Sequence, residues 1–230
     1  MAIKELKYPR IEILTKYKKS NFDIFYLDDS TKMYRIHNSA YGWLFYDSGA
    51  GGRFNGNIPK FSQKFLNSNL DVKNFMEQNL TGFGTCYLAA DINGALSESV
   101  FRSMEEIDNF FISKDVLINK KGVEVLLPEK KRLELVDLTS YRNRALLKID
   151  VRIFSHENYS KCHLWAHLFY ILGFDGICYE GRNNGDKCFA IFDKNQLHID
   201  DGEDLGLLGD SFLFPNLELL AKNLEILIDK

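Results

Sequence analysis

The sequence predicts a single domain of the α+β class. Stretches such as RLELVDL (132–138) alternate apolar and polar residues, as strands do, and they make the middle of the chain β-rich. Other stretches, such as KCHLWAHLFYIL (161–172), have the length and apolar spacing of helices. With 230 residues, of which 45% are hydrophobic, the chain can bury one large core.

In the first third of the chain, strand patterns alternate with turn residues. FDIFYLDD (22–29) alternates weakly, and KMYRIH (32–37) predicts a strand that carries Arg35. The glycine-rich YDSGAGGRFNGNIPK (46–60) predicts a loop that presents Arg53. Residues 61–80 have roughly helical spacing and predict short helices or a structured insertion.

The stretch GTCYLAADINGALSESV (84–100) predicts a short strand, a turn and a helix. Asp91 is placed to cap a helix that runs to about Ser103, with Leu96 and Val100 on its buried face. A tight connection could aim Tyr87 of the strand and Glu98 of the helix into one cleft. The alternative is that Glu98 is an ordinary exposed glutamate on the helix surface.

The second half predicts further strands and two longer helices. DVLINKKGVEVLL (115–127) suggests two strands joined at residues 120–122, and Ser160 could cap a helix that stops at Gly173. DGICYE (175–180) and KCFAIF (187–192) suggest a hairpin, and DDGEDLGLLGD (200–210) suggests a loop. From Pro215 on, leucines at helical spacing predict an amphipathic helix that packs on its own domain or, alternatively, forms a dimer or partner interface.

Composition and charge narrow the class of protein. The formal charge of −3 and pI near 6.0 do not suggest a direct nucleic-acid partner. The four cysteines form no C-x-x-C pair, and the start of the chain is charged rather than apolar. The longest apolar run, residues 168–174, is far shorter than the ~18 residues of a membrane span. We therefore expect a cytoplasmic protein without a membrane segment.

Two motifs have less specific meanings. The loop GAGGRFNG lacks the Gly-Lys-Ser/Thr of a phosphate loop, so Arg53 either holds a phosphate group or lies solvated on a surface turn. His163 and His167 have the i, i+4 spacing that can place two imidazoles on one metal ion. No third ligand is evident in the sequence, so we expect no metal and interpret both as part of a half-buried helix face.

Five segments together resemble the RES domain family. They are MYRIH, GGRFNG, GTCYLAADINGALSES, RLELVDLT and GFDGICYEGRNNGDKCFAIF, and they cover about residues 31 to 194. The most specific family pattern, G-x-x-Y-x-A-x-x-x-x-x-A-L-x-E, is met by Tyr87, Ala89, Ala95, Leu96 and Glu98. A later G-x-x-Y-x-S-R pattern is met at Gly176, Tyr179 and Arg182, but Gly181 occupies the serine position.

The resemblance implies a fold and an activity. It implies an ADP-ribosyltransferase-like mixed β-sheet core with flanking helices, and an intracellular toxin that degrades NAD⁺ by phosphorolysis or hydrolysis. NAD⁺ would be the substrate, inorganic phosphate a possible co-substrate, and no further cofactor would be needed. A helix-turn-helix antitoxin is the implied partner, and a homodimer is possible. The alternatives are transfer of ADP-ribose to a protein or nucleic acid, and a catalytically silent NAD-binding relative, which the glycine at position 181 would suggest.

The resemblance also assigns roles to residues. Glu98, Arg53 and Tyr87 would be catalytic, with Glu98 stabilising the oxocarbenium-like transition state. Arg35, Tyr87, Gly181 and Arg182 would bind NAD⁺. Relative to the family, residues 1–30 would form an N-terminal extension, about 57–82 an insertion and about 200–230 a C-terminal helical extension of one domain spanning residues 1–230.

Overall fold

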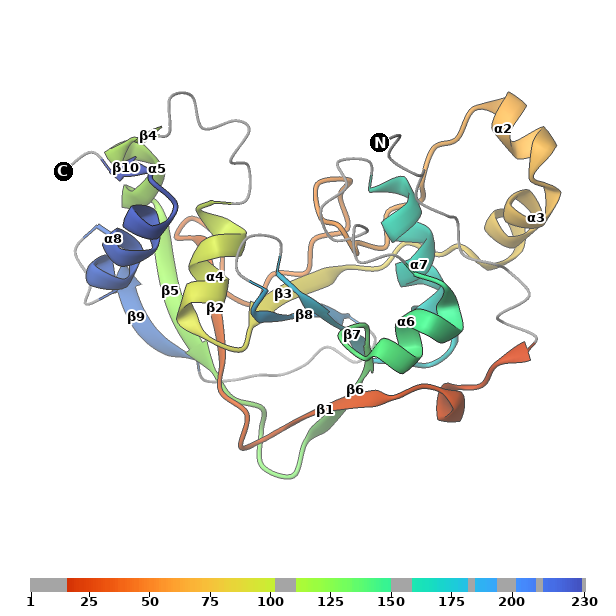
Figure 1. Cartoon of the computed structure of the whole chain (residues 1–230), viewed down its shortest axis with the longest axis horizontal. Coiled ribbons are helices and arrows are strands. Elements are labelled where there is room, and N and C mark those ends of the chain that lie inside the picture. Colours follow the sequence, from red (N-terminus) through yellow and green to blue (C-terminus); the bar gives the residue numbers. More distant parts are fainter. Residues whose placement is uncertain are drawn as a thin grey trace.

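A mixed eight-stranded sheet runs through the centre of the molecule (Figure 1), confirming the α+β class. The computed structural model describes residues 16–101, 111–149, 159–181, 185–193, 202–209 and 213–228. The strand order is β1-β6-β7-β8-β3-β2-β5-β9, with β6 and β7 parallel and the other neighbours antiparallel. The strands are β1 (Ile24–Asp28), β2 (Met33–Asn38), β3 (Thr85–Ala89), β5 (Lys120–Val125), β6 (Arg132–Asp137), β7 (Gly176–Glu180), β8 (Lys187–Phe192) and β9 (Glu203–Leu207), with β4 (Phe111–Ile112) and β10 (Leu227–Ile228) forming a separate pair.

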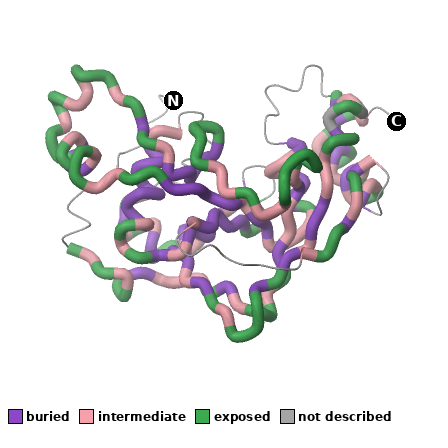
Figure 2. Tube along the Cα trace, turned by 180° about the vertical axis from the view of Figure 1, so that it is seen from behind, coloured by how far each residue is buried: buried purple, intermediate pink, exposed green. Residues whose placement is uncertain are grey.

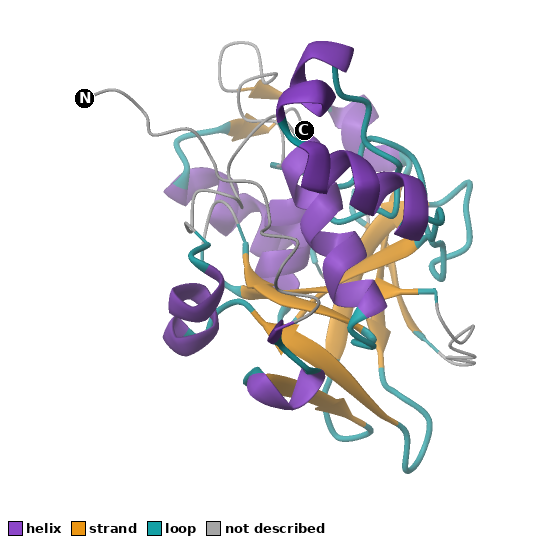
Figure 3. Cartoon of the chain, turned by 90° about the vertical axis from the view of Figure 1, so that its right-hand side faces the viewer, coloured by secondary structure: helices purple, strands orange, loops and turns teal. Residues whose placement is uncertain are grey.

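Helices pack around this sheet, and Figure 3 shows most of them above the strands in that view. They are the 3₁₀ turn η1 (Lys19–Asn21) and the α-helices α2 (Gln63–Ser68), α3 (Leu70–Asn79), α4 (Ile92–Ser99), α5 (Lys114–Ile118), α6 (Tyr141–Leu147), α7 (Ser160–Ile171) and α8 (Phe214–Asn223). Residues 161–169 of α7 are all buried, His163 and His167 included, so the expected half-buried helix face is wrong and the helix is enclosed on every side. The pair α2 and α3 projects from the body (Figure 1) and is largely exposed (Figure 2).

The sheet has a seam between β2 and β3. These strands share the single residue pair Tyr34 and Ala89, whereas β2 pairs with β5, and β3 with β8, along their lengths. The two halves of the sheet therefore separate beyond this point. Helix α4 packs against β2, β3 and β8 and so lies over the seam (Figure 1). A cavity can form here because backbone pairing does not close the gap.

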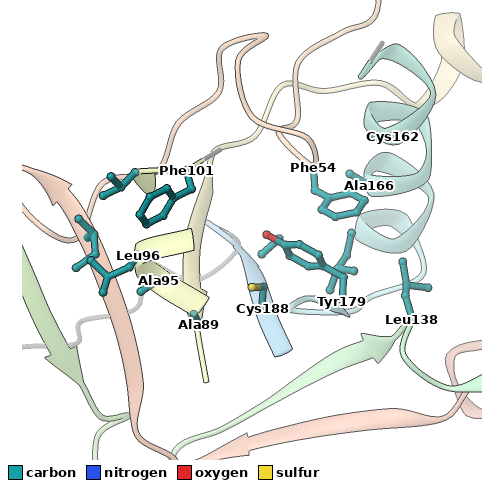
Figure 4. Close-up of a cluster of buried hydrophobic side chains, with 14 of the residues drawn as sticks. Phe54, Ala89, Ala95, Leu96, Phe101, Leu138, Cys162, Ala166, Tyr179 and Cys188 are labelled. Atoms are coloured by element: carbon teal, nitrogen blue, oxygen red, sulfur yellow. The ribbon is translucent and has the colours of Figure 1, made fainter. Parts of the chain in front are cut away.

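One apolar cluster connects the loop before α2, helix α4, helix α7 and strands β7 and β8. Figure 4 shows Phe54 of the loop beside Tyr179 of β7, with Cys188 of β8 next to that ring. The rings of Phe54 and Tyr179 meet edge to face, with their centroids 5.1 Å apart. The loop is therefore anchored in the core rather than lying on the surface.

Most of the predicted elements are confirmed. Residues 63–68 and 70–79 form the expected short helices, and β7 and β8 form the expected hairpin. Asp91 caps α4 by accepting a hydrogen bond from the Gly94 backbone N–H at 2.8 Å. Leu217 of α8 is fully buried, which confirms that this helix packs on its own domain. The possible homodimer stays a prediction.

Several boundaries were wrong. Residues 114–118 form α5 and not a strand, so residues 115–127 contain one strand rather than two. Residues 203–207 form edge strand β9 and not a loop, and α4 ends at Ser99 rather than near Ser103. Ser160 is the first residue of α7, whose N-cap position is Tyr159. Within the predicted N-terminal extension, β1 pairs with β6 and is therefore part of the main sheet.

Two further features concern the class of protein. All four cysteines are buried and unpaired by disulfides, as small apolar side chains would be. Within the described residues, the helices are too short or too polar to traverse a bilayer.

Candidate active site

A cavity of about 330 Å³ opens at the seam of the sheet, a size that suits a small-molecule site. Its wall brings together Arg35 of β2, Arg53 of the loop, Tyr87 of β3 and Glu98 of α4. The other lining residues are Tyr34, Ile36, Phe45, Asp47, Gly52, Thr85, Leu88, Ala89, Ala95, Ser99, Lys120 and Tyr179. Residues from distant parts of the sequence therefore meet where β2 and β3 diverge.

The loop that carries Arg53 is held by a buried asparagine. Asn55 is fully buried, and its amide nitrogen donates to Asp47 Oδ2 and to the Gly49 carbonyl, both at 2.8 Å. Gly52 approaches the Asn55 side chain so closely that a Cβ at this position would collide with the amide. The glycine-rich composition thus allows a compact turn, and not a mobile surface loop.

Tyr87 fixes the same loop from the sheet. Its hydroxyl accepts a hydrogen bond from the Phe54 backbone N–H at 2.7 Å and donates one to Asn55 Oδ1 at 2.8 Å. From the same strand, the Thr85 hydroxyl donates to the Phe54 carbonyl at 3.0 Å. Strand β3 therefore sets the backbone position of the residue that follows Arg53.

His163 and His167 hold the loop from the opposite side. His163 Nε2 donates to the Gly52 carbonyl at 2.8 Å, and His167 Nε2 lies 3.4 Å from the Asn57 carbonyl. Burial lowers the pKa of both imidazoles, that of His167 to about 4. Among the described residues, no group of three potential ligands surrounds a metal position. The sequence singled out this pair but did not reveal that it anchors the Arg53 loop.

Arg53 is a buried cation with unsatisfied donors. The side chain is only 5% exposed, so the alternative of a solvated surface arginine is wrong. Its Nε and Nη1 find no hydrogen-bond partner among the described residues. The guanidinium lies 5.7 Å from the ring centroid of Tyr179 and 5.9 Å from that of Tyr159. Buried donors without partners cost about 1–3 kcal/mol each, so this group is suited to an anionic ligand.

Arg35 has a partly structural role. Its Nη1 donates to the Trp43 and Phe45 carbonyls at 2.6 and 3.1 Å and contacts Cys86 Sγ at 2.7 Å. Burial raises the pKa of the Cys86 thiol, and the charge of Arg35 opposes that shift. Arg35 therefore ties residues 43–45 to β2 while it contributes positive charge to the cavity.

Glu98 supplies negative charge on the α4 side of the cavity. Burial raises the pKa of Tyr179 well above its usual value, and the charge of Glu98 raises it further. Burial and, secondarily, Glu98 also raise the pKa of the Cys188 thiol. The phenol and the thiol near Glu98 therefore stay neutral near pH 7.

Of the two remaining predicted residues, the structure describes Gly181. Gly181 is buried; its N–H donates to the Asp186 carbonyl at 2.7 Å, and its carbonyl accepts from the Gly185 N–H at 3.2 Å. Among the residues that the structure describes, the cavity lining does not include Gly181. Arg182 lies outside the described residues. Lys120 is a cavity residue that the sequence analysis does not predict, because the pattern of residues 120–122 indicates a turn between strands.

The fold and this site define an α+β domain with a small-molecule cavity at the seam of its sheet. The RES domain family model matches residues 32–207, so the chain belongs to the RES domain family. One chain of the crystal structure of the M. tuberculosis MbcT–MbcA toxin–antitoxin complex has a similar fold, with a TM-score of 0.57 and 14% identity. The similarity covers 92% of this chain and 96% of that chain. No curated protein matches the sequence.

Proposed function

We propose that this protein is an enzyme that cleaves the nicotinamide–ribose bond of NAD⁺. The observation that carries the proposal is that one cavity is lined both by Arg53, whose buried Nε and Nη1 have no hydrogen-bond partner among the described residues, and by the carboxylate of Glu98. A dinucleotide has both matching features: an anionic diphosphate for the arginine and a cationic nicotinamide ribose for the carboxylate. Membership of the RES domain family supports the assignment.

The chemistry follows from the charges. When the bond between the nicotinamide nitrogen and ribose C1 breaks, its electron pair leaves with nicotinamide, and positive charge develops on the ribose. A carboxylate beside C1 stabilises this charge more in the transition state than in the ground state. Glu98 supplies that carboxylate, and Arg53 and Arg35 supply positive charge for the diphosphate. Tyr87 and Tyr179 also line this cavity.

The proposal includes a biological role. We propose an intracellular toxin that depletes NAD⁺ and is neutralised by an antitoxin, and the structural similarity to a chain of a toxin–antitoxin complex supports the toxin and antitoxin parts of this role. We propose a helix-turn-helix antitoxin as the partner. Co-expression with the neighbouring open reading frame should restore growth that the protein alone arrests, and unchanged growth on expression of the protein alone would contradict the toxin role.

Product analysis tests the activity. Purified protein is incubated with NAD⁺ in buffers with and without inorganic phosphate, and the products are separated by chromatography. We expect free nicotinamide together with ADP-ribose or ADP-ribose 1-phosphate. Label from radioactive NAD⁺ on protein or nucleic acid would instead indicate ADP-ribosyl transfer. Calorimetric binding of NAD⁺ without nicotinamide release would indicate a silent binding protein.

A further inference from the structure

Lys120 is a basic residue of the cavity to which neither the sequence nor the family resemblance assigned a role. It is the first residue of β5, and its side chain lines the same cavity as Glu98. Its Nζ lies 3.2 Å from the hydroxyl of Ser99, which directly follows Glu98 at the end of α4. A lysine and a hydroxyl in contact with each other therefore line the same cavity as Glu98.

This lysine lacks the counter-charge that nearby lysines have. Lys121, next on the strand, pairs with Asp204 at 2.5 Å, and Lys32 pairs with Glu124 at 2.7 Å. Within the described part of the chain, no carboxylate lies within ion-pair distance of Lys120. Burial lowers its pKa, with no nearby charge to offset the shift. The C-terminal end of α4 offers only a partial negative charge of about half a unit.

We propose that Lys120 and Ser99 form an anion subsite that binds a phosphoryl group beside Glu98. The inference rests on the proposed function and deepens it. An ammonium offers three donors and a serine hydroxyl one more, so the pair can bind two or more phosphoryl oxygens. A bound phosphoryl group supplies a counter-charge at ion-pair distance, which no carboxylate of the described residues provides for Lys120.

Two phosphoryl sources share this chemistry. The first is the diphosphate of the dinucleotide, for which Lys120 would act together with Arg53. The second is inorganic phosphate as the acceptor. In that case a phosphate oxygen bonds to ribose C1 as the C1–nitrogen bond breaks, and nicotinamide takes the electron pair of the broken bond. Pyridinium-ribose and HPO₄²⁻ then give neutral nicotinamide and a monoanionic ribose 1-phosphate, so charge and atoms balance.

The test compares Lys120→Met with Lys121→Met. Both variants remove one ammonium from β5, but consecutive strand residues face opposite sides of the sheet, so Lys121 is the matched control. Lys120→Arg retains the charge. Melting temperatures establish that each variant folds, and we expect Lys120→Met to be at least as stable as the wild type, since it removes an uncompensated, partly buried charge.

Two measurements separate the phosphoryl sources. If the subsite binds the dinucleotide, Lys120→Met weakens calorimetric binding of ADP-ribose by about 10- to 100-fold in phosphate-free buffer, the scale of a charged hydrogen bond. If it binds the acceptor, Lys120→Met abolishes the stimulation of nicotinamide release by inorganic phosphate, while KM for NAD⁺ stays unchanged. In either case Lys121→Met behaves as the wild type. Lys120→Arg retains most of the wild-type ADP-ribose affinity or phosphate stimulation, because it keeps the positive charge.

The outcomes also separate this inference from the proposed function. Wild-type protein that releases no nicotinamide overturns the proposed activity, and ADP-ribose calorimetry still tests the subsite. The subsite is overturned if the wild type is active but Lys120→Met has the same ADP-ribose affinity and the same phosphate response as Lys121→Met. The proposed activity would then still stand.

Discussion

Replacing Tyr87 by phenylalanine removes one hydroxyl that holds the Arg53 loop. That oxygen accepts from the Phe54 N–H at 2.7 Å and donates to Asn55 Oδ1 at 2.8 Å. Asn55 is fully buried, so its oxygen cannot turn to solvent when the hydroxyl is lost. The ring of Tyr87 is retained, and the change therefore tests the two hydrogen bonds and not the packing of the side chain.

The expected magnitude follows from those two bonds. Leaving a buried donor or acceptor unpaired costs about 1–3 kcal/mol, so we expect a loss of about 2–3 kcal/mol in the free energy of unfolding. For a protein of this size, this loss corresponds to a fall in Tm of roughly 4–12 °C. Because the loop also positions Arg53, we expect KM for NAD⁺ to rise at least about tenfold, the effect of one weakened charged contact.

Thermal unfolding followed by circular dichroism, together with NAD⁺ kinetics, measures both effects. Tyr26→Phe is the matched control, because Tyr26 lies half exposed on edge strand β1 and stacks with Arg132 through its ring, which phenylalanine keeps. We expect this control to change Tm by less than about 1 °C. Equal melting temperatures for the wild type and Tyr87→Phe would refute the conclusion that this hydroxyl anchors the loop.

Three further outcomes follow from the structure. Arg53→Met should raise the Tm of the ligand-free protein, because it removes unsatisfied buried donors, yet weaken NAD⁺ binding at least about tenfold by calorimetry. The folded pKa of His167, about 4, lies below its unfolded value near 6.5, so its contribution to stability is present above pH ~6.5 and is lost as the pH falls toward 4. Urea unfolding should thus show about 2 kcal/mol less stability at pH 5 than at pH 7, and His167→Gln should reduce that difference. Gly181→Ser should change NAD⁺ turnover by no more than about tenfold, the limit of one neutral hydrogen bond, and a larger gain would indicate that the natural protein is a silent relative.

Helices and strands are predicted correctly where the capping residues and the spacing of buried apolar residues indicate the same element. Asp91 is a good N-cap residue placed before an apolar helix, and the α4 helix begins there. Residues 114–118 form a helix although valine, leucine and isoleucine adjoin there, because a short apolar run predicts a strand and a helix equally well. Edge strand β9 is acidic and contains glycine, so it lacks the alternation of apolar and polar residues that predicts a strand. Backbone pairing with β5 holds it in the sheet instead.

The candidate site was only partly predictable for a similar reason. Arg53 and Glu98 belong to segments with recognisable local patterns, so the sequence identified them. Lys120 and Lys121 are the same residue type on neighbouring positions of one strand. They differ in their surroundings, since Lys120 lines the cavity and Lys121 forms an ion pair with Asp204. The loop contacts of His163 and His167 join residues more than a hundred positions apart in the sequence, and no short-range pattern encodes such contacts.

Nicotinamide release by the wild type and by Glu98→Gln tests the central claim most directly. Glutamine preserves the size of the side chain and its hydrogen-bonding capacity but removes the charge that opposes the developing ribose cation. With equal melting temperatures and equal ADP-ribose affinities for the two proteins, we predict that the rate of nicotinamide formation at saturating NAD⁺ falls at least about 100-fold in Glu98→Gln. Equal rates in the two proteins would contradict the account.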